Sequence, residues 1–448
     1  MRRLLICTPS HAVHGGVEAI VNDLTRELPR RGWDVVLGLA AGQRFNDPQR
    51  YRAAYPDLNS IDIDGSGGTR QARVEALIRA VRTTRPDVVL AARIFDAYPS
   101  IALLKRQQGG PRLAVAIRAC ESDYLHDVRL HRAVIDLCVA DGNLLAAACE
   151  EWCGMAAERV ANIPGGVRMP QVIPEPRRRR TPIRLGYVGR LAQHDKRIFD
   201  LVPFLEELDR RQLAYQMDVV GTGPDAEAVA QALSEWLRRG IVRWHGWQDS
   251  AALYERFLPA LDCVVHFSAA EGVTIAPREA MAHGVVPVIS EFLGIYAQRH
   301  FVHEHNALIF PVGQVAVAAR HVQRLVSEPG LLTRLSATAA GSQTGAYEHG
   351  GSIDAWASAL DKAMGLAPAC GTVPVLRHPD EGRLARLRLH PWLAQRLRDV
   401  LHVRPVYADP GSEWPTSSGT LTSEDRDEFQ RFASEYEARC REATTTDS

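Results

Sequence analysis

The stretch Glu271-Gly272-Val273-Thr274-Ile275-Ala276-Pro277-Arg278-Glu279 joins an apolar run, Cys263–Phe267, to an amphipathic run that ends at His283. An apolar run without polar alternation is typical of a strand buried on both faces of a parallel sheet. The spacing after Thr274 predicts a helix over Ala276–His283. A buried strand, a loop containing glycine and a helix, in this order, form the repeating unit of a doubly wound α/β fold.

The same stretch carries the strongest indication of a binding site. The start of a helix presents unpaired N–H groups and a partial positive charge, which suits a diphosphate. Gly272 lets the backbone come close to a ligand, beside Val273 and Thr274. The carboxylates of Glu271 and Glu279 can accept hydrogen bonds from paired hydroxyls, as on a ribose or hexose. Either glutamate alone would be read as a solvated charge, but the combination predicts a donor site.

Strand and helix patterns alternate on both sides of this stretch. Strands are predicted at Leu4–Thr8, Asp34–Leu39, Asp87–Ala91, Leu113–Ile117, Ile135–Ala140, Ile183–Val188, Tyr215–Val220, Ile241–Trp244 and Val286–Ile289. Helices are predicted at Val17–Arg30, Arg73–Thr83, Gly142–Cys153, Ile198–Asp209, Asp225–Arg238 and Asp354–Met364. Two doubly wound units are therefore expected. Ligands of such units bind beyond the carboxyl ends of the strands, so we expect a cleft between the units.

The domain boundaries follow from breaks in this alternation. Two prolines and four arginines in Pro174–Arg180 cannot continue a packed element, so residues 174–181 are predicted to form a linker. The chain is thus predicted to contain a first Rossmann-like domain at 1–173 and a second at 182–364, which the family resemblance described below implies to be the acceptor-side and donor domains. A partly helical extension is predicted at 365–448.

Composition is typical of a folded protein, and the balanced charge gives no general indication of nucleic-acid binding. Of the 448 residues, 46% are hydrophobic and 24% charged, and 53 basic residues balance 53 acidic ones. The first apolar run stops at Thr8, too soon for a signal peptide or a membrane span. The eight cysteines form no CxxC pair, so a reducing cytoplasm is expected.

Two further motifs point to phosphate chemistry. In Val188-Gly189-Arg190-Leu191, Arg190 leaves the end of a predicted strand, and Lys196 follows shortly after. Cations placed there can neutralise a departing diphosphate. Gly15-Gly16 lies between the first strand and the first helix, where glycines permit a tight turn and a close backbone approach.

Two other patterns suggest alternative chemistries. Gly221-Thr222-Gly223-Pro224-Asp225-Ala226 fits the loose dinucleotide pattern, but the next predicted strand ends in His245-Gly246 and lacks the acidic residue that a dehydrogenase needs for the ribose. Asp62-Ile63-Asp64 resembles the DxD of metal-dependent sugar transferases. It is predicted to end a strand instead, and no metal or other cofactor is expected.

These motifs, in this order, resemble the retaining GT-B glycosyltransferases with the EX7E motif. The matching residues, over about Leu4–Met364, are Gly15-Gly16, Gly189-Arg190-Leu191 with Lys196, Gly221-Thr222-Gly223-Pro224, Glu271 with Glu279, Ala282–Pro287 and His305–Leu308. The resemblance implies two Rossmann-like domains facing a cleft and sugar transfer from a UDP- or GDP-sugar without a metal. It implies that Glu271 contacts the donor sugar, Glu279 the ribose, and Arg190 and Lys196 the diphosphate.

One departure from the family concerns the first domain. Many members carry a histidine near the reacting sugar, whereas this chain has Ile117-Arg118-Ala119-Cys120-Glu121-Ser122-Asp123 at that place. Arg118, Glu121 and Asp123 are the candidates to replace it in contacts with the sugar or the acceptor. The acceptor classes are a glycan, a lipid-linked saccharide and a small metabolite. A nucleotide-sugar epimerase and a non-catalytic nucleotide-sugar binding protein are the alternative functions.

The extension beyond Gly365 lies outside the resemblance. Arg383–Leu401 is rich in Arg and Leu, with Leu384, Leu387, Trp392, Leu393 and Leu397 among the arginines and Pro391 as an interruption. One interpretation is a helix packed on the body, with snorkelling arginines. The other is peripheral attachment to an anionic inner-membrane surface. Glu424–Glu442 is predicted to be a charged helix.

Overall fold

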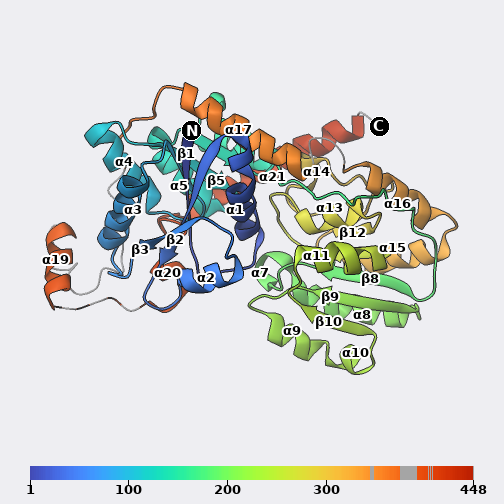
Figure 1. Cartoon of the computed structure of the whole chain (residues 1–448). Helices are drawn as coiled ribbons and strands as arrows, with labels where there is room; N and C mark the ends of the chain where they lie inside the picture. Colours follow the sequence, from blue (N-terminus) through green and yellow to red (C-terminus); the bar gives the residue numbers. More distant parts are fainter. Residues whose placement is uncertain (344–347, 374–390, 402, 404, 406, 447–448) are drawn as a thin grey trace. The chain divides into compact units, whose positions relative to one another are not determined.

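The computed structural model describes residues 1–343, 348–373, 391–401, 403, 405 and 407–446. The chain forms two compact units (Figure 1). Unit 1 contains Met1–Ile163 and Ile353–Phe432, and unit 2 contains Pro164–Ser352 and Ala433–Ser448. The units are therefore assembled from separate stretches of chain, unlike the contiguous ranges predicted from the sequence.

Unit 1 contains a seven-stranded parallel sheet in the order β3-β2-β1-β4-β5-β6-β7. The strands are β1 (Arg2–Thr8), β2 (Trp33–Ala41), β3 (Ser60–Asp64), β4 (Val88–Ala91), β5 (Arg112–Ile117), β6 (Leu137–Ala140) and β7 (Val160–Asn162). The helices before the linker are α1 (Gly16–Glu27), α2 (Pro48–Ala54), α3 (Arg70–Thr84), α4 (Ala97–Gln108), α5 (Ser122–His131) and α6 (Asn143–Ala147).

The core of unit 1 explains why the chain returns to it. Leu4 and Ile6 of β1 pack in one buried cluster with Leu24 of α1. Trp356 and Leu360 of α17 (His349–Gly365), both fully buried, complete the same cluster. The helix predicted at Asp354–Met364 exists, and its apolar face closes unit 1.

Unit 2 contains a six-stranded parallel sheet in the order β10-β9-β8-β11-β12-β13. Its strands are β8 (Ile183–Val188), β9 (Tyr215–Val220), β10 (Val242–Gly246), β11 (Cys263–His266), β12 (Val286–Ser290) and β13 (Leu308–Phe310). Its helices are α7 (Gln193–Lys196), α8 (Leu201–Arg210), α9 (Ala226–Ala232), α10 (Ser234–Arg238), α11 (Ser250–Ala252), α12 (Leu258–Ala260), α13 (Ile275–Ala282), α14 (Ile295–Gln298), α15 (Val315–Ser327) and α16 (Leu331–Gly341).

The strand predictions are confirmed with small shifts of their ends. The helix predicted at Asp225–Arg238 is two helices, α9 and α10, which are separated at Leu233. Strands β7 and β13 were not predicted, because runs of three residues carry too little pattern.

The predicted linker has neither helix nor strand between Pro174 and Arg180. Its arginines bind unit 2. Arg177 donates to the carbonyls of Leu258 at 3.2 Å and His283 at 2.9 Å, and Arg180 pairs with Asp262 at 2.7 Å. The charge run therefore fixes the linker to the rest of unit 2.

The C-terminal extension contains three described helices, α19 (Pro391–Leu401), α20 (Pro410–Glu413) and α21 (Ser423–Thr446). Pro391 is the first residue of α19, where a missing N–H costs nothing. That Pro391 interrupts a longer helix over Arg383–Leu401 stays a prediction. Arg383–His390, with Leu384 and Leu387, lies outside the described residues. Helix α21 confirms the predicted helix at Glu424–Glu442, and Phe429 packs edge-on against Trp152 at 5.3 Å.

Candidate functional site

Glu271 lies in the loop between β11 and α13, where three donors meet one oxygen of its carboxylate. Ser268 Oγ donates to Oε1 at 2.6 Å, His266 Nε2 lies 3.1 Å from Oε1, and Lys196 forms an ion pair with it. Oε2 receives no hydrogen bond from the described residues. The Glu271 carboxylate is therefore fixed through one oxygen, and its other oxygen can accept from a ligand.

The electrostatics keep this carboxylate ionised. Burial raises the pKa of Glu271, but the Lys196 ammonium and His266 outweigh burial and hold that pKa well below its usual range. Burial lowers the pKa of His266, so its imidazole is a neutral hydrogen-bond donor. Sequence reasoning missed His266 and Ser268, because a histidine at the end of an apolar run looks like a core residue.

Arg190 and Lys196 follow β8 at the same edge of the sheet. The Arg190 side chain is 55% exposed and pairs with Asp195 at 2.5 Å. The Asp195 carbonyl accepts the N–H of Ala269 at 2.9 Å, which joins the loop after β8 to the loop that carries Glu271. The two predicted cations and Glu271 are thus brought together within unit 2.

Glycines are required where the loop after β8 meets the loop after β9. A Cβ on Gly221 would lie 1.9 Å from the Gly189 carbonyl oxygen, and one on Gly223 would lie 2.2 Å from that of Leu191. The dinucleotide-like pattern is therefore explained by close contact between two backbones.

The loop that carries Glu271 continues through Gly272, Val273 and Thr274 into α13. All three residues are buried, and the Thr274 hydroxyl has no partner among the described residues. Gly272 accepts a hydrogen bond from Gln298 at 3.1 Å through its carbonyl. The start of α13 thus holds one buried hydroxyl that no described residue binds.

Glu279 lies on α13 and is bound by the hydroxyl of Tyr254, a residue that the sequence analysis did not select. The ring of Tyr254 stacks on His283 at 5.5 Å. Arg278, within the same motif, is fully buried and donates to the Gly165 carbonyl at 2.7 Å. Glu279 is therefore positioned by its neighbours, whereas Arg278 is structural.

In unit 1, the candidate residues follow the carboxyl ends of neighbouring strands. Gly15 and Gly16 begin α1 after β1, and a Cβ on Gly15 would lie 2.3 Å from the buried Glu18 carboxylate. Arg118 follows β5 and pairs with Asp141, which follows β6, at 3.1 Å. Glu121 and Asp123 lie at the start of α5.

Arg93 and His11 join this edge of the unit 1 sheet and were not selected from the sequence. Buried nitrogens without a hydrogen-bond partner among the described residues are His11 Nδ1, Arg93 Nε and an Arg118 Nη. Arg93 also adopts a left-handed backbone conformation, with φ of 61°. Such strain and unused polar atoms are typical of ligand-binding edges.

The DxD-like pair is occupied by local contacts. Asp62 pairs with Arg52, and Asp64 accepts the N–H of Ser66 at 2.9 Å. Within the part of the chain that the structure describes, no group of three His, Cys, Asp or Glu side chains could hold a metal ion.

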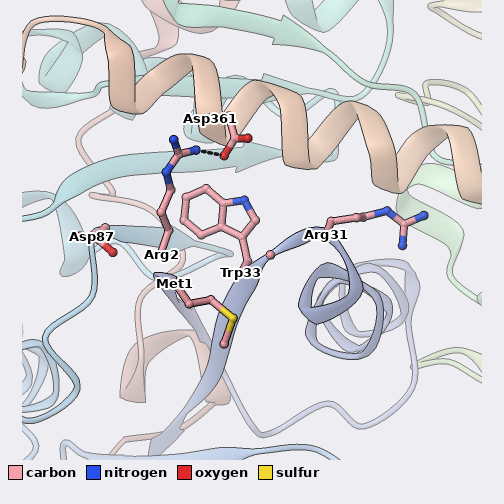
Figure 2. A pocket seen from close by; sticks show the side chains of 7 residues that line it. Met1, Arg2, Arg31, Trp33, Asp87 and Asp361 are labelled. Carbon is pink, nitrogen blue, oxygen red and sulfur yellow. Dashed lines mark hydrogen bonds and ion pairs between the residues drawn. The ribbon is translucent and has the colours of Figure 1, made fainter.

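A hollow at the opposite edge of the unit 1 sheet is lined by Met1, Arg2, Trp33 and Asp361 (Figure 2). Arg2 pairs with Asp361 and lies 5.9 Å from the centre of the Trp33 ring. The hollow lies at the amino ends of β1 and β2, away from the edge where ligands of doubly wound folds bind.

Comparisons with known proteins identify two regions of the chain. Residues 15–162 match the family described as "Glycosyl transferase 4-like domain", and residues 182–328 match "Glycosyl transferases group 1". A search of curated proteins finds no match. None of the described helices is both long and apolar enough to cross a lipid bilayer.

Several solved structures share the fold. Sucrose-phosphate synthase from Thermosynechococcus elongatus is 16% identical, with a TM-score of 0.67 over 82% of this chain and 100% of that one. Anabaena HepE in complex with UDP and glucose is 16% identical, with a TM-score of 0.63 over 81% and 100%. Pneumococcal O-GlcNAc transferase GtfA in complex with UDP and GlcNAc is 12% identical, with a TM-score of 0.65 over 81% and 99%. The two matched regions and the shared fold make the chain a GT-B glycosyltransferase, with a glycosyl transferase 4-like domain in unit 1 and a group 1 domain in unit 2.

Proposed function

We propose that the chain transfers a hexose from a nucleoside-diphosphate donor with retention of configuration and without a bound metal. The supporting observation is the Glu271 carboxylate, which is fixed through one oxygen by Lys196, His266 and Ser268. Its other oxygen is the acceptor for donor-sugar hydroxyls. Glu279 on α13 binds the ribose, and Gly272, Val273 and Thr274 carry the diphosphate at the helix start.

Arg190 and Lys196 supply positive charge where the sugar–phosphate bond breaks. Negative charge grows on the β-phosphate in the transition state, and fixed cations stabilise it more there than in the ground state. The amides after Gly272 assist. With the carboxylate of Glu271 already engaged by Lys196, the departing phosphate takes the acceptor proton on the same face of the sugar, so configuration is retained.

We propose UDP as the nucleotide of the donor sugar. HepE and GtfA, which share the fold, have structures in complex with UDP. The direct test is thermal stabilisation by UDP, GDP and ADP, because a ligand that binds only the folded state raises the melting temperature. An epimerase would convert the nucleotide sugar without an acceptor, so NMR of the products over a panel of nucleotide sugars separates the two functions. An inverted anomeric centre would refute the same-face route.

Metal independence has its own test. Activity is expected to survive excess EDTA, because Arg190 and Lys196 stand in for a cation. A complete loss of activity in EDTA that Mn²⁺ reverses would overturn the proposal and would favour a metal site at Asp62 and Asp64.

The acceptor is proposed to bind at the carboxyl edge of the unit 1 sheet. Arg118, Glu121 and Asp123 offer donors and acceptors suited to sugar hydroxyls, in a glycan, a lipid-linked saccharide or a small metabolite. The Arg118–Asp141 pair replaces the family histidine at this position. Arg118→Ala is expected to raise KM for the acceptor and leave UDP affinity unchanged, and the reverse pattern would remove Arg118 from the acceptor site.

The outward face of α19 supports peripheral attachment to an anionic membrane. Ala394, Gln395 and Arg398 are buried against unit 1. The exposed residues include Arg396 and Asp399 together with five apolar ones, Trp392 (47% exposed), Leu393 (44%), Leu397 (38%), Val400 (76%) and Leu401 (61%). So much exposed apolar surface on one helix is typical of an interaction site. Arg396 lies 4.8 Å from the Trp392 ring centre, and Arg383, Arg386 and Arg388 precede the helix in sequence. Exposed apolar residues flanked by arginines are typical of membrane-surface helices.

Co-sedimentation with vesicles tests this attachment. The wild-type chain is expected to sediment with phosphatidylglycerol vesicles and not with phosphatidylcholine vesicles. Trp392→Ser combined with Val400→Ser should abolish sedimentation. Leu103→Ser, at a residue of unit 1 that is 41% exposed, is the matched control and should behave as wild type. Sedimentation that is unchanged in the double variant would refute the α19 surface.

A further inference from the structure

The second half of α21 holds a segment of unit 2 by two charged contacts. Glu437, a largely buried residue of α21, accepts the backbone N–H groups of Tyr296 at 2.6 Å and Ala297 at 3.0 Å. One turn later, Arg441 pairs with Glu291 at 2.8 Å and lies 5.2 Å from the Tyr296 ring centre. Helix α21 therefore fixes residues 291–298, which follow β12.

The fixed segment is bonded directly to the loop that carries Glu271. The Leu293 carbonyl accepts the N–H of Glu271 at 3.2 Å, and the Leu293 N–H donates to the Ala269 carbonyl at 2.9 Å. The side chain of Gln298, buried at the end of α14, donates to the Gly272 carbonyl at 3.1 Å. The backbone on both sides of the Glu271 side chain is thus set by residues 293 and 298.

We propose that Glu437 is a positioning residue for the donor site, acting through Tyr296–Gln298 on Gly272 and Glu271. Both oxygens of the Glu437 carboxylate are used, one for each backbone N–H, so the start of α14 has one allowed position. That position aims the Gln298 amide at Gly272. Displacement of a binding loop by about 1 Å costs up to a hundredfold in rate, so a remote support of this kind is functionally significant.

This role is not supplied by the family match. The matched regions end at residue 328, and Glu437 lies more than a hundred residues beyond. The assignment rests on the proposed function in one respect, namely that the Glu271–Thr274 loop binds the donor. The link from Glu437 to that loop is a property of the structure and can be measured without activity.

The test compares Glu437→Gln with Glu435→Gln. The amide introduced by Glu437→Gln would keep one acceptor oxygen and place an NH₂ group against the second backbone N–H. Glu435 lies on the same helix two residues earlier and is exposed, so its variant controls for loss of charge. Hydrogen exchange by mass spectrometry is expected to rise over residues 269–275 in Glu437→Gln only. KM for the nucleotide sugar should rise about tenfold, with acceptor KM little changed.

The outcomes separate this proposal from the proposed function. Unchanged exchange at 269–275 in Glu437→Gln, or an equal rise in both variants, overturns the positioning role. A second outcome is raised exchange in Glu437→Gln together with a wild-type protein that binds neither UDP, GDP nor ADP. This result would support the link from Glu437 to the loop and refute the proposal that the loop binds the donor. If Glu437→Gln does not fold, Gln298→Ala breaks the same link inside unit 2 and must give the same donor-specific rise in KM. An equal rise in donor and acceptor KM in that variant overturns the proposal.

Discussion

The Glu413 carboxylate accepts a hydrogen bond of 3.0 Å from the side-chain amide of Asn46. It also accepts the backbone N–H groups of residues 43–46. The Asn46 side-chain oxygen in turn accepts the N–H groups of Ser10 at 3.0 Å and His11 at 3.3 Å. One buried glutamate of the extension thus ties the loop after β2 to the loop after β1, which leads to Gly15 and Gly16.

Glu413→Gln is expected to destabilise the protein. The amide can serve only part of the cluster of N–H groups, and each buried group left without an acceptor costs about 1–3 kcal/mol. Urea unfolding should show a loss of about 2 kcal/mol or more. Glu428→Gln is the matched control, because Glu428 pairs with Arg129 on the surface and exposed pairs contribute about 0–1 kcal/mol. Equal losses in the two variants would contradict the role of Glu413.

The same contact predicts an acid dependence. Burial raises the pKa of Glu413, but the hydrogen bonds from Asn46 and the backbone outweigh it and hold the pKa below its ordinary value of 4.5. A group whose folded pKa is lowered stabilises the fold above its unfolded pKa, and this contribution is lost as pH falls through the folded value. Wild type should therefore lose stability below about pH 4.5 more steeply than Glu413→Gln. Parallel stability curves for the two proteins would rule this out.

Substitutions of Glu271 and Glu279 are expected to differ in effect. Glu279→Ala should weaken UDP binding, because the Glu279 carboxylate is the proposed ribose acceptor. Glu271→Gln should mainly lower kcat, because the amide loses the ion pair with Lys196. Titration calorimetry and steady-state kinetics separate the two effects. Transfer at wild-type rates in both variants would mean that the donor lies elsewhere.

The cations after β8 are expected to act on turnover. Loss of one charged donor to the leaving phosphate should cost roughly 3 kcal/mol, about a hundredfold in rate, in Arg190→Ala and in Lys196→Ala. Lys196→Arg should restore activity only in part, because a planar guanidinium does not replace a point charge. Single-turnover kinetics provide the measurement. A larger effect on donor KM than on kcat would assign these residues to ground-state binding.

The sequence predicted the parts of the molecule in which neighbours along the chain are also neighbours in space. Strand β11, the glycine loop after it and α13 are of this kind. Arg190 and Lys196, which are close together along the chain, are another example. The hydrogen-bond partners of Glu271 and Glu279 could not be predicted from the sequence, because His266 looks like a core residue and Tyr254 comes from another helix. Glu413 and Glu437 were missed for a stronger reason. An acidic residue in a charged segment looks solvated, and its target lies more than a hundred residues away.

The discontinuity of unit 1 has a consequence for protein engineering. Trp414 is fully buried and donates to the Ala41 carbonyl at 3.0 Å, next to Glu413 in its cluster of backbone N–H groups. A chain that ends at Met364 would lack Trp414 and Glu413. It would have a cavity the size of an indole ring and several backbone N–H groups without an acceptor beside β2. Hybrids that exchange acceptor specificity between relatives therefore cannot be made by recombining at one crossover near residue 163. The donated fragment has to include residues 353–432, so such a graft needs at least two junctions.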